Sequence, residues 1–246
     1  MTEYLDLNNI DTFRDILTYP KFGEEVYKTR LNELIDLGIR FITAGGSTMV
    51  RNTKILGKGS VGLVVKARHG RRILALKIRR VDANRNNMYE EVLLHSIANS
   101  IGIGPTLIDY SENFILMEFI NGFKITDLYK KDIKPPRLRK LIVSLLEQCF
   151  SMDQLGLDHG QLSNLNHHVI VSKNNPVIID FETSSMKRKS NNVTSVVQYF
   201  LMSNQFSNKL TGSNDTCNKK AVIKLLKEYK EFRSRDLFEK ITEIFS

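Results

Sequence analysis

The 246-residue sequence has no tryptophan and only two cysteines, Cys149 and Cys217. These cysteines lie far apart and outside any Cys-x-x-Cys pair, so we expect packed, reduced thiols, with no disulfide framework or zinc site. No apolar run approaches the roughly 18 residues that a membrane span needs. The first residues are acidic where a secretory signal begins with basic residues. The sequence therefore predicts a soluble, cytoplasmic protein with no membrane partner.

The composition is otherwise that of a globular protein, with 41% hydrophobic and 26% charged residues, which excludes collagen-like and low-complexity classes. The charge is unbalanced, because 36 Lys and Arg against 27 Asp and Glu give a formal net charge of +9. From Arg51 to Arg85, eleven cationic residues stand against the single acid Asp82. A surface of this kind attracts polyanions such as nucleotide phosphates, RNA, a ribonucleoprotein or an acidic protein. The alternative is a solvated face that only maintains solubility.

Hydrophobic spacing divides the chain into three parts. Residues 1–48 show the 3.6-residue period of short helices, so we expect an N-terminal helical extension. Residues 49–120 begin with three strand-like runs and continue with a helix and two short strands, which predicts a small mixed lobe. Residues 121–246 contain a long helix that opens at Pro135-Pro136 and ends by Gly156, followed by two strands and further helices.

Glycine recurs between the first two expected strands, in the sequence Gly57-Lys58-Gly59-Ser60-Val61-Gly62-Leu63-Val64. In this GxGxxGxV pattern, glycines let a hairpin backbone approach phosphate groups closely. A dinucleotide-binding fold uses a similar motif, but there the motif opens a helix. Here Leu63-Val64 continues directly into a strand. The sequence therefore predicts a phosphate-binding hairpin.

One lysine, Lys77, stands among apolar residues of the third strand, in Ala75-Leu76-Lys77-Ile78. A lysine there needs an anion, and the next helix carries Glu90 and Glu91. We predict Glu90 as the partner, because Leu93 and Leu94 then occupy the apolar positions three and four residues further on. The pair would hold the lysine ammonium against the α- and β-phosphates of a nucleotide. The alternative is a strand-edge lysine that reaches water.

Residues 57–182 resemble the protein-kinase-like fold, most closely its minimal atypical branch of RIO-type kinases, the KEOPS-complex kinase and related archaeal predicted serine/threonine kinases. The resemblance implies an α+β, two-lobed fold with a kinase N-lobe at 49–120 and a minimal C-lobe at 121–246, binding ATP and Mg²⁺. Residues 114–120 would then form the hinge, with Met117 as gatekeeper and the backbone of Glu118 and Ile120 as adenine's partners. The other implied nucleotide-binding residues are Gly57, Lys58, Gly59, Ser60, Gly62, Val64, Ala75 and Lys77.

The run Asp158-His159-Gly160-Gln161-Leu162-Ser163-Asn164-Leu165-Asn166 is similar to the HGDLxxxN catalytic loop of the atypical kinases. The likeness implies that His159 braces the loop and that Asn166 ligates magnesium. The position of the catalytic aspartate holds Gln161, however, and an amide does not take a proton from a substrate hydroxyl at neutral pH.

Three compensations for the missing base remain open. Asp158 acts as the base, or His167 does, or Gln161 orients a water molecule, which would give a slow ATPase. The alternatives are a loop-capping role for Asp158 and a surface position for His167. A positioned base contributes roughly 100- to 10,000-fold, whereas phosphoryl transfer gains most of its rate from positioning and charge neutralisation. The substitution therefore does not by itself exclude catalysis.

Asp180-Phe181-Glu182 follows the apolar run Val177-Ile178-Ile179 and resembles the DFG triplet of kinases. The resemblance makes Asp180 the main magnesium ligand. Glu182 replaces the glycine, which reduces the backbone freedom of that position. No APE-like segment follows, so the peptide platform of ordinary protein kinases is not assumed.

Taken together, these motifs predict an ATP- and magnesium-dependent atypical serine/threonine protein kinase, a phosphotransferase that labels protein substrates and itself. Its expected catalytic residues are Lys77, Glu90, Gln161 and Asp158, and its expected metal ligands are Asn166 and Asp180. The alternative is a pseudokinase or slow ATPase in which nucleotide binding regulates a protein or ribonucleoprotein partner.

Overall fold

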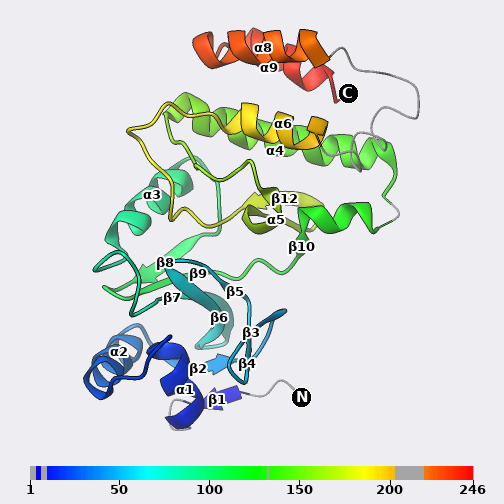
Figure 1. Cartoon of the computed structure of the whole chain (residues 1–246). Helices are drawn as coiled ribbons and strands as arrows, with labels where there is room; N and C mark the ends of the chain where they lie inside the picture. The colour runs from blue at the N-terminus through cyan, green and yellow to red at the C-terminus, as the bar shows by residue number, and fades with distance from the viewer. Residues whose placement is uncertain (1–3, 7–9, 132, 203–218, 246) are drawn as a thin grey trace. The chain divides into compact units, whose positions relative to one another are not determined.

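The computed structural model describes residues 4–6, 10–131, 133–202 and 219–245. The chain forms two compact units, one of residues 1–99 with 105–120 and the other of residues 100–104 with 121–246. The first unit combines an antiparallel sheet with helices, and the second is mostly helical (Figure 1). This mixed architecture confirms the predicted α+β fold class.

A seven-stranded antiparallel sheet forms the first unit, in the order β1-β2-β6-β7-β9-β8, with β5 also paired to β6. A separate hairpin pairs β3 with β4, so the first of the three strand-like runs expected after residue 48 is divided among the three short strands β3, β4 and β5. Arg51, with φ of 49°, makes the turn of that hairpin. The strands are β1 (Tyr4–Asp6), β2 (Ile39–Thr43), β3 (Thr48–Val50), β4 (Thr53–Ile55), β5 (Gly57–Lys58), β6 (Gly62–His69), β7 (Arg72–Arg79), β8 (Leu107–Tyr110) and β9 (Phe114–Glu118).

Residues 1–48, expected to be helical, supply both helices and strands. Helices α1 (Ile10–Leu17) and α2 (Glu24–Asp36) are present, but β1 and β2 also come from this segment, and β2 pairs with β6. The expectation of helices alone was wrong because strands of three and five residues are too short to show a clear two-residue period. The N-terminal segment is therefore part of the sheet.

The two faces of the sheet pack against different helices. Successive residues of a strand point to opposite faces, and in β9 Phe114 and Leu116 join the core formed with α1 and α2. Ile115, between them, packs instead with Val92 of α3 (Tyr89–Ser100). Helix α3 therefore covers the face opposite to α1 and α2.

The second unit is built on α4 (Pro135–Leu155), which begins at the predicted proline pair and ends at Gly156, whose φ is 79°. Helix α6 (Asn192–Met202) lies alongside it, and α8 (Lys219–Phe232) packs against α9 (Arg235–Glu243) (Figure 1). A three-stranded sheet has the order β10-β11-β12. The remaining elements are β10 (Phe123–Lys124), the 3₁₀ helix η1 (Ile125–Tyr129), α5 (Leu165–His168), β11 (Val169–Ser172) and β12 (Asn175–Ile178).

A buried carboxylate ties three of these helices together. Asp153 on α4 accepts hydrogen bonds from the backbone N–H of Asn192 at 3.0 Å, from its Nδ2 at 2.9 Å, and from the N–H of Val193 at 3.2 Å. It also accepts one from the Tyr229 hydroxyl of α8 at 3.0 Å. Burial raises the pKa of Asp153, and these hydrogen bonds oppose that rise. The first turn of α6 is thereby fixed to α4.

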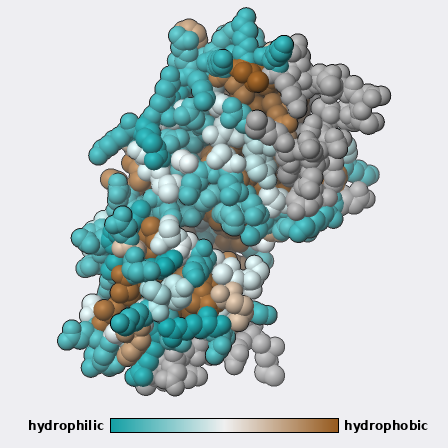
Figure 2. All heavy atoms as spheres, in the orientation of Figure 1, coloured by the Kyte–Doolittle hydropathy of each residue, from teal (hydrophilic) through white to brown (hydrophobic). Residues whose placement is uncertain are grey.

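Cys149 is a free, buried thiol, and burial raises its pKa well above the usual value. Cys217 lies outside the described residues. Among the described helices, none is both long and apolar enough to cross a bilayer. Hydrophilic residues cover most of the visible surface of each unit (Figure 2).

Candidate functional site

The sheet register brings several of the predicted nucleotide-binding residues to one face. Val64 pairs with Lys77, Lys77 with Ile115, and Ala75 with Met117. Side chains of directly paired residues lie on the same face of a sheet. Since Ile115 packs toward α3, this face is the one that α3 partly covers. Val64, Ala75, Lys77 and Met117 therefore share one surface of the first unit.

Lys77 is buried in an ion pair. Its Nζ lies 2.6 Å from Oε1 of Glu91 on α3, and the two side chains are 5% and 3% exposed. The other Glu91 oxygen lies 3.8 Å from a guanidinium nitrogen of Arg85. A buried ammonium is tolerated only with such a partner. Glu91 thus holds the lysine head at a fixed position on the α3 face.

The prediction that Glu90 is this partner was wrong. Glu90 is exposed, and so is Leu93, which had been used to set the phase of the helix. The buried stripe instead follows the spacing i, i+3, i+4 and i+7 along Glu91, Leu94, His95 and Ala98. His95 belongs to it because its Nε2 donates to the Pro105 carbonyl at 2.7 Å. Counting the histidine as a buried position would have selected Glu91 from the sequence.

Gly62 allows the lysine stem to pass under the glycine-rich loop. A Cβ built on Gly62 would lie 3.1 Å from Cγ and Cε of Lys77 and 3.0 Å from the Ile78 carbonyl oxygen. The loop itself is closed by the Gly59 N–H, which donates to the Gly62 carbonyl at 2.8 Å. The third glycine of the motif is therefore required by the close approach of the lysine stem.

Two contacts that the sequence did not indicate brace this loop. The Lys58 ammonium donates to the Tyr19 hydroxyl, and Arg80 donates to the Gly59 carbonyl at 3.0 Å. The Arg80 guanidinium also lies 5.3 Å from the centroid of the Tyr19 ring. Ser60 is exposed at the tip of the loop.

At the expected hinge, one backbone group is already used. The Glu118 N–H donates to the Thr106 carbonyl at 2.8 Å, and the Glu118 side chain accepts from the Thr106 hydroxyl at 3.2 Å. The Glu118 N–H is therefore not available to adenine. Ile120 and Met117 are half-buried.

In the second unit, His159 braces the loop before α5. Its ring is fully buried, and Nε2 donates to the Ile179 carbonyl at 3.1 Å. Burial, reinforced by the nearby His168, lowers the pKa of His159 to about 4, so the ring is neutral. The His159 N–H donates to Oδ1 of Asn192 at 3.0 Å. The loop is therefore held from both the strand side and the α6 side.

The β11–β12 hairpin positions the two expected metal ligands. Val169 pairs with Ile178, and the Ile179 N–H donates to the His168 carbonyl at 2.9 Å, which extends the pairing toward Asp180. Asn166 lies on α5 at the same end of the hairpin, where its Oδ1 accepts from the Thr126 hydroxyl at 2.6 Å.

Asp180 has an unusual backbone. Its φ is 69°, a left-handed conformation that non-glycine residues seldom adopt and that occurs often at functional sites. Its side chain is 30% exposed, with Oδ2 4.0 Å from Nδ1 of His168. No sequence pattern indicated that His168 would lie here.

The side chains of Asp180 and Asn166 suit a magnesium ion by their donor chemistry. Carboxylate and amide oxygens are ligands that Mg²⁺ accepts, usually one or two from the protein with substrate phosphates and water completing the shell. The described residues contain no group of three or more His, Cys, Asp and Glu that could hold a metal by itself. By themselves, these two side chains would leave most of the coordination shell to phosphate and water.

Asp158 is engaged as a structural carboxylate. Its Oδ2 accepts from Nε of Arg188 at 2.9 Å, its Oδ1 accepts from the Asn191 N–H at 3.4 Å, and its backbone pairs with Ser185. This favours the loop-capping interpretation over a role as base. Gln161 is half-buried, and its Oε1 has no hydrogen-bond partner among the described residues.

With this geometry established, comparison with known proteins decides the family. A family model of the RIO domain matches residues 68–200, more than half of the chain. The chain belongs to the RIO domain family. This atypical kinase-like family confirms the resemblance seen in the sequence, and the matched RIO range contains Lys77, Glu91, Gln161 and Asp180.

The RIO match begins after the glycine-rich loop, which lies outside it. The chain is also 30% identical, over 81 residues, to the uncharacterized protein MJ1211 of Methanocaldococcus jannaschii. That alignment covers 33% of this chain and 68% of the relative.

The two neighbouring glutamates of α3 should differ sharply in their effect on stability. Glu91→Gln removes the carboxylate that lies 2.6 Å from the buried Lys77 ammonium, so we expect a loss of roughly 3–5 kcal/mol in the free energy of unfolding. Glu90→Gln changes an exposed residue, and we expect a change within about 0.5 kcal/mol. Urea unfolding of both variants measures the difference. Equal losses would contradict the assignment of Glu91.

The buried neutral His159 should make stability depend on acid pH. Its pKa is lowered from 6.5 to about 4, so between these values the unfolded chain binds a proton that the folded chain does not. We expect this residue to reduce the free energy of unfolding by about 1.4 kcal/mol per pH unit as the pH falls through that window. Urea unfolding across the window should show a smaller slope for His159→Gln and an unchanged slope for the exposed control His167→Gln. Parallel slopes for wild type and His159→Gln would refute this.

Proposed function

We propose that this RIO protein is an ATP- and magnesium-dependent atypical serine/threonine protein kinase that also phosphorylates itself. The observation that carries the proposal is the buried pair of Lys77 and Glu91, with 2.6 Å between their charged atoms. Val64, Ala75 and Met117 share the same face of the sheet. Folding alone does not require an ion pair there, since apolar residues of similar volume are often as stabilising.

Each half of the site has a role in this proposal. Lys77 would neutralise the α- and β-phosphates of ATP beneath the glycine-rich loop, while the Glu118 carbonyl and the Ile120 backbone would bind adenine. Asp180 and Asn166 would hold Mg²⁺, which when bound supplies positive charge to the β- and γ-phosphates. His159 keeps the backbone before Asp180 in place through the Ile179 carbonyl.

The proton of the acceptor hydroxyl is the difficult step. Gln161 does not accept it, and Asp158 would have to give up Arg188 and the Asn191 N–H to do so. His167 is exposed on α5, next to Asn166, and is the remaining candidate for the base. We therefore expect slow transfer, reduced by roughly 100- to 10,000-fold relative to an enzyme with a positioned base.

A labelling assay tests this function. Purified protein is incubated with Mg²⁺ and ATP labelled at the γ-phosphate, alone and with a generic protein acceptor, and both protein-bound label and free phosphate are measured. We expect label on serine or threonine, lost in Lys77→Ala and Asp180→Ala and retained in the exposed control Lys187→Ala.

The other outcomes of that assay distinguish the alternatives. Free phosphate without protein label would indicate the slow ATPase in which Gln161 orients water. A nucleotide-induced rise in melting temperature without either product would indicate a pseudokinase. Both results would overturn the kinase proposal.

A ribonucleoprotein or RNA partner is a second candidate, favoured by one feature. Arg68, Arg71 and Arg72 are exposed around the turn between β6 and β7 in the first unit. Three neighbouring cations on one hairpin form a surface suited to a phosphate backbone.

If this hairpin binds RNA, affinity should fall steeply with salt. We expect Arg71→Glu with Arg72→Glu to weaken binding and to reduce the slope of log affinity against log salt by about 1 for each phosphate that the protein no longer neutralises. Fluorescence anisotropy with a labelled single-stranded RNA measures both. Lys220→Glu with Lys227→Glu, exposed on α8 or at its start, serves as the charge-matched control. Equal weakening by the two double variants would show a general charge effect only.

A further inference from the structure

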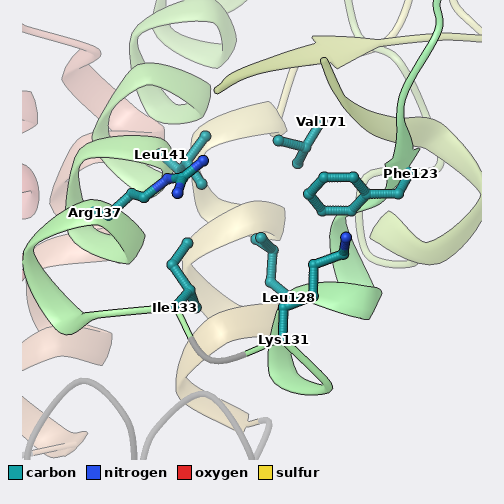
Figure 3. Close-up of a pocket in the computed structure, with 7 residues that line it drawn as sticks. All are labelled: Phe123, Leu128, Lys131, Ile133, Arg137, Leu141 and Val171. Atoms are coloured by element: carbon teal, nitrogen blue, oxygen red, sulfur yellow. The ribbon is translucent and has the colours of Figure 1, made fainter. Parts of the chain in front are cut away.

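An apolar pocket opens in the second unit beside the first turns of α4. Its volume is about 190 Å³. Figure 3 shows side chains from β10, η1, α4 and β11 converging on it. The lining residues are Phe123, Leu128, Lys131, Ile133, Arg137, Leu141 and Val171.

The floor of the pocket is apolar and well packed. Leu128, Leu141 and Val171 are each 2% exposed, so their positions are set by the core. The Lys131 ammonium lies 4.1 Å from the centroid of the Phe123 ring and covers that aromatic face. Arg137 donates to the side-chain oxygen of Asn174 at the β11–β12 turn. Two cations thus frame an apolar hollow.

A second hollow adjoins the first and extends its basic rim. It has a volume of about 540 Å³ and shares Arg137 and Leu141 with the pocket. It adds Lys140 and Lys173, which are both exposed. In the sequence, residues 121–140 carry seven Lys and Arg against two Asp. The N-terminal end of α4, which is the positive end of its helix dipole, also lies beside the groove and adds to the positive charge of these side chains.

The volume and the lining residues of the pocket indicate which class of ligand it can bind. The apolar pocket alone, at about 190 Å³, is below the roughly 300–1,000 Å³ typical of small-molecule sites, so it suits a single apolar side chain. The adjoining hollow of about 540 Å³ is lined by Arg137, Lys140 and Lys173, so it suits acidic groups beside that side chain. Single-stranded nucleic acid is usually bound by exposed aromatic rings on which bases stack. The one aromatic residue that lines this pocket, Phe123, is covered by Lys131. An apolar anchor with negative charge beside it is the remaining match.

We infer that this basic-rimmed groove docks an acidic segment of a partner protein, which inserts one leucine, isoleucine or phenylalanine into the pocket. Apolar anchors in pockets dominate the affinity of such contacts, and complementary rim charges provide specificity and a faster encounter. The carboxylates of the segment would lie along Arg137, Lys140 and Lys173.

The groove is physically connected to the catalytic loop through η1. Thr126 of this 3₁₀ helix donates to Asn166, and Leu128, two residues on, lines the pocket. A segment docked here would therefore be held on the same unit as the expected metal ligands. The docking itself does not depend on ATP or on catalysis.

The test is selection from a random peptide library displayed on phage, using the full chain, followed by fluorescence anisotropy of the selected peptides. We expect enriched peptides with a single large aliphatic or aromatic residue flanked by Asp and Glu. Changing that residue to alanine should weaken binding about tenfold or more, since burial of one large apolar side chain supplies much of the affinity of such a contact.

Two charge-matched double variants complete the test. Lys140→Glu with Lys173→Glu should weaken the selected peptides about tenfold, as expected for two exposed ion pairs that become repulsive. Lys187→Glu with Lys189→Glu, also exposed in this unit, should leave binding unchanged, and melting temperatures verify that both variants fold. Because these positions are exposed, a failure to fold is not expected of either.

Four results would overturn the inference. The first is a selection that enriches no peptides, or only peptides without the acidic and apolar pattern, and the second is equal weakening of binding by both double variants. The third is unchanged affinity after the apolar residue of the peptide is replaced by alanine, and the fourth is displacement of the peptide by RNA at comparable concentration. Loss of kinase activity without loss of peptide binding would leave the docking inference intact and refute only the proposed function.

Discussion

The ion pair between Lys77 and Glu91 is the constraint on which the first unit depends. Two charges buried at 5% and 3% exposure persist only at hydrogen-bonding distance, so α3 has to be fixed against the sheet. Gly62 belongs to the same constraint, because any side chain there would press on the lysine stem at 3.1 Å. The glycine motif and the lysine, which look like separate signals in the sequence, are thus parts of one arrangement.

In the second unit, a chain of hydrogen bonds has the corresponding role. Asp153 fixes Asn192, Asn192 accepts from the His159 N–H, and the His159 ring donates to the Ile179 carbonyl next to Asp180. This chain of bonds connects the centre of α4 to the backbone of the expected metal ligand. His159 completes it because burial keeps its imidazole neutral. A site built this way is suited to positioning charges, which is the larger part of phosphoryl-transfer catalysis.

Long periodic segments could be located from the sequence, and contacts between distant residues could not. The buried stripe of α4 and the paired strands β6 and β7 extend over many residues, so their periods are clear. Strands β1 and β2 are too short for that, and the phase of α3 was misjudged because one exposed leucine, Leu93, outweighed one buried histidine, His95. The bond between Asp158 and Arg188 joins residues 30 positions apart. No local pattern indicates such a pairing, so the capping role of Asp158 became evident only in the fold.

The proposed docking groove would compensate for the slow phosphoryl transfer that the amide at Gln161 implies. A reaction without a positioned base is slow, so an acceptor that dissociates quickly would leave before transfer. Holding a segment of the acceptor elsewhere on the same unit raises the effective concentration of its hydroxyl group without any new contact at the reacting atoms. Helix η1 connects the expected metal site with the docking groove, because Thr126 donates to Asn166 while Leu128 lines the groove. Specificity would then come from the docked segment, which agrees with a chain that lacks the APE-like region of ordinary kinases.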